Sequence, residues 1–75
     1  MSIYDCNKNE EYFITQVNIG DDRLKLRLYE IGFFIGSKIK VLNKSFLNKT
    51  LLVYVLDSCF SIKGEEAKLI EVCNA

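Results

Sequence analysis

The sequence contains no histidine, no proline and no tryptophan. Without histidine, the chain lacks the side chain that most often serves as a general base or a metal ligand near neutral pH. It also lacks a Gly-x-Ser-x-Gly nucleophile motif and a glycine-rich phosphate loop followed by lysine and a hydroxyl residue. We therefore predict no enzyme activity, no catalytic residues and no bound cofactor.

Cysteine is scarce, with three residues at positions too far apart to form a Cys-x-x-Cys pair. An odd, widely spaced set argues for reduced thiols. Cys59 and Cys73 fall on strands that could be neighbours, but we expect Cys59 to be a small core residue and Cys6 to lie on a loose arm. The ligand supply thus predicts no metal site, with a metal-binding chaperone kept as an alternative.

Long hydrophobic runs are missing as well, and none approaches the ~20 residues that span a bilayer. The polar N-terminus MSIYDCNKNEE does not look like a signal peptide. We expect a cytoplasmic protein that does not insert into membranes. Its 75 residues form one domain, with residues 1–11 as a flexible arm.

What is present is a chain that is 49% hydrophobic and rich in short β-type segments. β-Branched and aromatic runs predict strands over 12–19, 37–45, 50–57, 59–63 and 68–72. We expect 50–57 to be the central strand, with turns at 46–49 and 57–58 and one helical turn at 64–67. Five short strands curl readily into a small barrel, so the fold class is mainly β.

The stretch DDRLKLRLYEIG fits two kinds of element. Its leucines first alternate with basic residues, as in a half-buried strand. Helical spacing instead aligns Leu24, Leu28 and Ile31. The flanks favour the helix, because aspartate can cap a first turn and Gly32 can end a last one. We predict a helix over 22–31.

The order of these elements resembles the FeoA family, small cytosolic proteins of bacterial ferrous-iron uptake. The resemblance covers residues 12–73 and is strongest in LYEIGFFIGSKIKVL, with further likeness in EEAKLIEV. Where the family usually has proline, this chain has Ile35, and the hairpin tip SFLNKTL also lacks the family's prolines. The matching positions are Leu28, Ile31, Gly32, Gly36, Ile39 and Val41.

This resemblance implies an SH3-like barrel of about five strands with one short helix between the first and second strands. It also implies an adaptor without enzyme activity that docks on the FeoB-type membrane transporter with its cytosolic G-domain. Gly32 and Gly36 are then structural turn residues. Whether two copies pair through an edge strand stays open.

Apolar residues in loops and beside the helix end predict the docking surface, although we expect about half of Phe33, Phe34, Phe46 and Leu47 to plug the ends of the barrel as core residues. They are joined by basic residues between Arg23 and Lys49, of which Lys38, Lys40 and Lys44 would steer an acidic partner. A nucleic-acid-binding barrel is a further alternative, disfavoured by the zero net charge. The predicted contact residues are Arg27, Leu28, Phe33, Phe34, Phe46 and Leu47.

Overall fold

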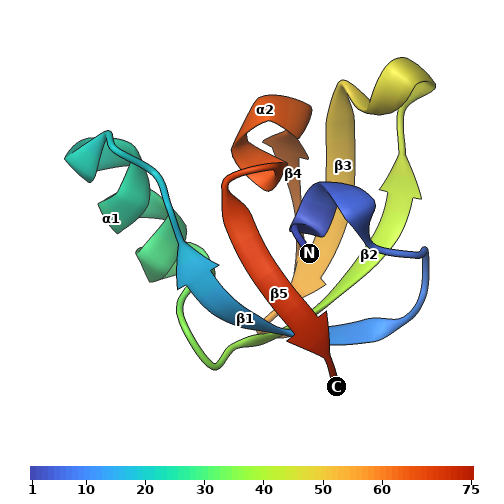
Figure 1. Ribbon diagram of the computed structural model, residues 1–75, viewed down its shortest axis with the longest axis horizontal. Coiled ribbons are helices and arrows are strands. Elements are labelled where there is room, and N and C mark those ends of the chain that lie inside the picture. The colour runs from blue at the N-terminus through green and yellow to red at the C-terminus, as the bar shows by residue number, and fades with distance from the viewer.

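The computed structural model describes all residues, 1–75, and contains five strands with a ten-residue helix between the first two (Figure 1). No helix combines the length and the apolarity needed to cross a membrane. The elements are the 3-10 turns Ile3–Asp5 and Phe46–Asn48, the helices α1 (Asp22–Ile31) and α2 (Gly64–Ala67), and the strands β1 (Glu11–Val17), β2 (Lys38–Lys44), β3 (Thr50–Val55), β4 (Ser58–Lys63) and β5 (Ile70–Asn74).

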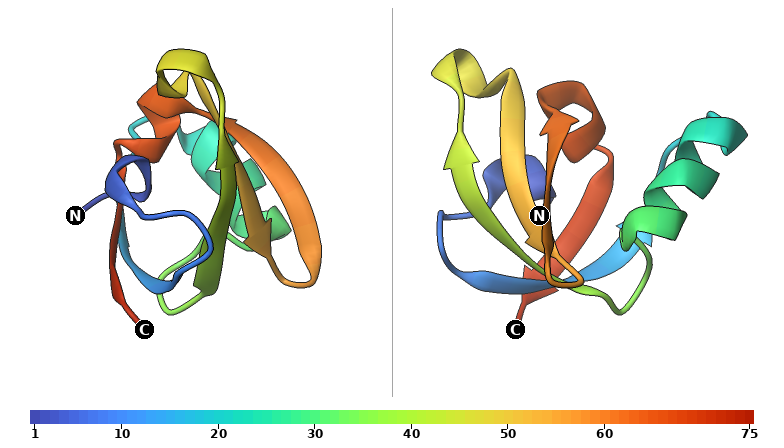
Figure 2. Two further views of the ribbon diagram at one scale, coloured as in Figure 1. Left: turned by 90° about the vertical axis from the view of Figure 1, so that its right-hand side faces the viewer. Right: turned by 180° about the vertical axis from the view of Figure 1, so that it is seen from behind.

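The strands form one antiparallel sheet in the order β4-β3-β2-β1-β5, which curls around the core (Figures 1 and 2). This confirms the predicted small barrel of five strands and the place of its helix. The expectation that 50–57 is the central strand is wrong, because β2 occupies that place and β3 lies beside it. The nearly continuous apolar run in β3 suggested a strand buried on both faces, but Tyr54 faces outward and is 39% exposed.

A core of 17 buried hydrophobic residues fills the barrel. Alternation in β2 places Ile39 and Val41 inside, as their period of two predicts. In β1 the alternation is interrupted by a register shift between Ile14 and Gln16. The extra residue of this bulge lets Val17 return to the core.

Both ends of α1 are fixed by hydrogen bonds to the helix backbone, which the flanking residues make possible. The Asp21 carboxylate accepts from the N–H groups of Arg23 and Leu24. At the other end Gly32 is left-handed, with φ +118°, and the Phe33 N–H donates to the Leu28 carbonyl at 2.8 Å. This is a Schellman ending, and the predicted helix over 22–31 is confirmed.

The N-terminal segment does not form the loose arm expected for residues 1–11. Ile3 and Cys6 are fully buried, and Ser2 bridges to Glu71 on the outer edge of β5. The Lys44 ammonium also donates to the Tyr4 carbonyl at 3.2 Å. The segment lacks periodicity because a 3-10 turn, rather than a strand or helix, brings its two apolar side chains into the core.

The β3–β4 turn consists of Leu56 and Asp57, one residue earlier than predicted. Both residues have positive φ, 47° and 62°. A two-residue hairpin turn with this geometry matches the twist of the two strands, and asparagine and glycine usually fill it. Leucine is unusual there, and its side chain lies against Gly32.

We expect Gly32→Ala to lower the free energy of unfolding by about 2 kcal/mol, because alanine is strained at this φ. A Cβ at position 32 would also approach side-chain atoms of Leu56 and Val55 to 2.9 Å. Urea denaturation measures the loss. Gly20→Ala is the matched control, since no atom lies within 4 Å of its added carbon, and equal losses in both variants would contradict the assignment.

Candidate protein-docking site

The structure moves two of the six predicted contact residues into the core. Leu28 is 3% exposed and Phe33 is 1% exposed, so both belong to the core, although each also lines a surface groove. The Schellman ending explains both, because the residue after the left-handed glycine typically packs against the last turn of the helix. The Gly32-Phe33 pair is the local sequence signal for this ending, and Phe33 is one of the loop residues that the core takes up.

The other four predicted residues do not form one patch. Phe46 and Leu47 are each 73% exposed, but they lie on the turn between β2 and β3. Figures 1 and 2 place that turn on a different side of the molecule from α1, which carries the exposed Arg27. Phe34 follows α1 and is half-buried, with its ring centroid 5.2 Å from that of Tyr29.

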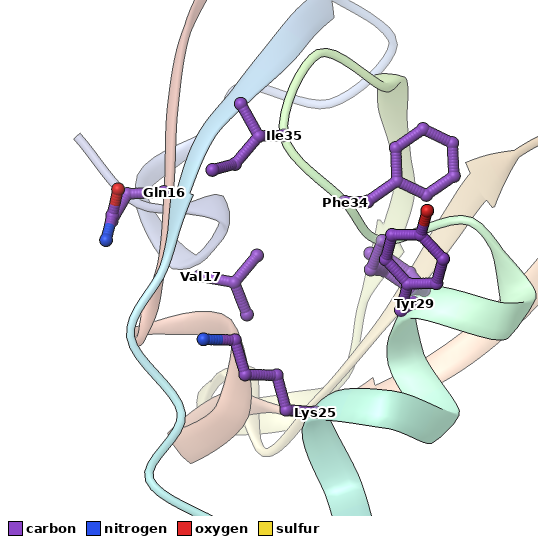
Figure 3. Close-up of a pocket in the computed structure, with 7 residues that line it drawn as sticks. Gln16, Val17, Lys25, Tyr29, Phe34 and Ile35 are labelled. Atoms are coloured by element: carbon purple, nitrogen blue, oxygen red, sulfur yellow. The ribbon is translucent and has the colours of Figure 1, made fainter. Parts of the chain in front are cut away.

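A groove of about 290 Å³ separates the end of α1 from β1 (Figure 3). We call it the loop groove, because the α1–β2 loop forms one wall. Tyr29 and Ile35 are 60% and 64% exposed, and Figure 3 shows Val17 and Ile35 on the β1 side of the opening and the rings of Tyr29 and Phe34 on the opposite side. Its lining residues are Gln16, Val17, Lys25, Tyr29, Phe33, Phe34 and Ile35.

The loop that carries Ile35 is held by the neighbouring strand. The Gly36 N–H donates to the Ile14 carbonyl at 2.7 Å, and the Ile14 N–H donates to the Ser37 carbonyl at 2.9 Å. Gly36 has φ +91°, the turn conformation for which glycine was expected. The exposed Ile35 side chain is thus presented by a fixed backbone, and sequence reasoning noted this residue only as a replacement for proline.

A second groove, of about 320 Å³, lies on the other side of α1. We call it the edge groove, because β4 is an edge strand of the sheet. Apolar residues of α1 and β4 form much of its surface, with charged residues at its rim. Its lining residues are Leu24, Arg27, Leu28, Ile31, Thr50, Phe60, Ser61, Ile62, Lys63 and Glu66.

The lysines expected to steer a partner have local contacts. The Lys38 ammonium lies 5.6 Å from the ring centroid of Phe13, and Lys44 contacts the N-terminal segment. Lys40 pairs across the sheet with Glu11 on one side and Tyr54 on the other. An acid and partly exposed aromatics therefore interrupt the basic face of β2.

The cysteines do not converge on a metal site. Cys59 lies on β4 and Cys73 on β5, at opposite edges of the sheet. Both are exposed, so the expectation that Cys59 is a core residue is wrong. It faces outward because Phe60 and Ile62 occupy the inner positions of β4. No group of three His, Cys, Asp or Glu side chains is placed to hold a metal ion.

Cys6 differs from the other two thiols. It is buried beneath the N-terminal turn, and burial raises the pKa of its thiol to about 11. The nearby Lys44 ammonium has the opposite effect and offsets only part of this rise in pKa. The thiolate is the reactive form of cysteine. Cys6 should therefore react slowly with thiol reagents, because its sulfur is inaccessible to them and stays protonated.

We expect a thiol reagent such as DTNB to modify two cysteines rapidly at pH 8 in the folded protein. The third should react only as the protein unfolds, because Cys6 is buried and protonated at this pH. Absorbance of the released thiolate counts the reactive groups. Cys6→Ser identifies the slow one, and three equally fast thiols in the native chain would contradict its burial.

Comparison with known proteins gives a consistent family. The FeoA domain model matches residues 1–73. A Campylobacter jejuni protein provisionally named Fe(2+) transport protein A is 31% identical over 72 residues, which are 96% of either chain.

Solved structures agree in fold. The FeoA protein of Chlorobium tepidum has a TM-score of 0.90 at 23% identity, over 99% of this chain and 70% of that one. Stenotrophomonas maltophilia FeoA, solved with zinc and described as an SH3 domain protein, has a TM-score of 0.81 at 25% identity. That match covers 96% of this chain and 88% of the other.

Proposed function

Since the chain belongs to the FeoA family, we propose that it is an accessory protein of ferrous-iron transport that has no enzyme activity and docks on the cytosolic part of a FeoB-type transporter. The Campylobacter relative is named for Fe(2+) transport. The Stenotrophomonas FeoA is proposed as an activating factor of such transport. The transporter as partner is an expectation from the family.

The observation that carries the proposal is the exposed apolar surface around the loop groove. Tyr29 and Ile35 are more than half exposed and flank Phe34 at the end of α1. A small domain rarely leaves several large apolar side chains together in solvent unless the surface binds something.

The surface is suited to docking because its backbone is held in place before binding. Gly32 ends the helix and Gly36 turns into β2, so the loop between them has a defined path. A rigid surface loses less conformational entropy when a partner binds. Docking changes transport only to the extent that the chain binds one transporter conformation more tightly than the other.

We expect Ile35→Asp to weaken capture of the transporter by about tenfold, because a carboxylate would replace an apolar contact in the loop groove. The measurement is retention of the detergent-solubilised transporter on immobilised protein over a concentration series. The matched control is Leu47→Asp, which makes the same kind of change at a similarly exposed position on the β2–β3 turn.

The two variants separate the competing surfaces. Loss in Ile35→Asp alone supports the loop groove, whereas loss in Leu47→Asp alone would move the docking surface to the β2–β3 turn. Equal retention of the transporter by both variants and the native chain would rule out both apolar surfaces. Circular dichroism of each variant checks that the fold is retained.

A further inference from the structure

The two edges of the sheet are covered differently. On the β5 edge, Ser2 bridges to Glu71 and the Val72 N–H donates to the Met1 carbonyl at 2.8 Å. The β4 edge has no such cover, because β4 pairs only with β3. An uncovered edge strand offers its free N–H and C=O groups to another extended chain.

The register identifies the free groups on β4. A two-residue turn makes Val55 and Ser58 a hydrogen-bonded pair, and bonded pairs alternate along an antiparallel ladder. The backbone groups of Cys59 and Ser61 therefore face away from β3. The Lys63 N–H, in the same phase, donates to the Glu66 carboxylate at 3.0 Å, as an outward-facing group would.

The edge groove runs beside β4 from Phe60 to Lys63, past the free groups of Ser61, and is apolar beneath them. Phe60 and Ile62 supply its β4 side, and Leu24, Leu28 and Ile31 supply its α1 side. Figure 2 shows α1 standing beside β4 without joining the sheet. A chain that paired with β4 would direct every second side chain towards this apolar surface.

The charged residues at the rim of the edge groove indicate which charge a bound segment should carry. Arg27 and Lys63 are both exposed there. The rim carboxylate, Glu66, has one oxygen engaged by the Lys63 N–H. An acidic segment complements this rim. A second copy that paired through its own β4 would instead bring two sets of Arg27 and Lys63 together, and like charges oppose such pairing.

We propose that the β4 edge binds an extended, acidic segment of the docking partner as a sixth strand, with alternate apolar side chains in the edge groove. This mode is β-strand addition, in which main-chain hydrogen bonds supply affinity and side chains supply specificity. The inference rests on the proposed docking function, because it names the chemistry of the segment that docks.

The test uses the ¹⁵N-labelled chain and an acetylated, amidated Glu-Val-Glu-Val-Glu peptide, followed by NMR titration to millimolar peptide. We expect saturable shifts at the amides of Cys59, Ser61 and Leu28. The peptide Lys-Val-Lys-Val-Lys should bind about tenfold more weakly, and Arg27→Glu should weaken the acidic peptide by a similar factor. Arg23→Glu, which reverses a charge on the same helix outside both grooves, should change affinity less than about twofold.

A form of the acidic peptide that is methylated at its glutamate nitrogens should not bind, because with the valines in the groove the glutamate N–H groups are the ones that would pair with β4. Equal effects of Arg27→Glu and Arg23→Glu, shifts centred on another surface, or no saturable shift would each overturn the proposal. Shifts at Cys59 and Ser61 that grow with protein concentration alone would assign the edge to a second copy, and would overturn it too. Capture of the transporter together with a silent peptide titration would defeat only this inference and leave the proposed function standing.

Discussion

The left-handed glycine at position 32 is the constraint on which the proposed docking surfaces depend. It ends α1 and allows Phe33 to bond back to Leu28, so that both side chains enter the core. That anchoring sets the direction of the chain towards Gly36 and determines which apolar residues remain outside. Ile35 is left exposed on the loop that follows, whereas Tyr29 is exposed because it comes directly after the buried Leu28 on the helix and so points to another side of it.

α1 has a structural role, and the proposed docking mode gives it a recognition role as well. Its inner face contributes Leu28 to the core, with Leu24 and Ile31 packed against it. The helix stands beside the sheet (Figures 1 and 2). Because few of its residues reach the core, a groove remains on each side of it. One groove presents fixed apolar side chains and the other presents an unpaired strand edge, so a single partner could engage both sides of the helix.

The fold followed from local signals that the sequence displays directly. The aspartate before α1, Gly32 after it and the alternation of Ile39 and Val41 each act within a few residues. The site was harder to predict, since exposure depends on long-range packing. Phe33 and Phe34 are adjacent and chemically identical, yet the Schellman bond buries the first and leaves the second half outside. The packed N-terminal segment likewise depends on contacts with β5 and Lys44, which are distant in sequence.

Leu56 occupies a turn position whose positive φ suits asparagine or glycine better than leucine. Its side chain lies in the space that the missing Cβ of Gly32 leaves open. The end of the helix and the tip of the β3–β4 hairpin therefore share one small volume. A side chain at position 32 would therefore meet two obstacles, the positive φ of the helix ending and the side chain of Leu56.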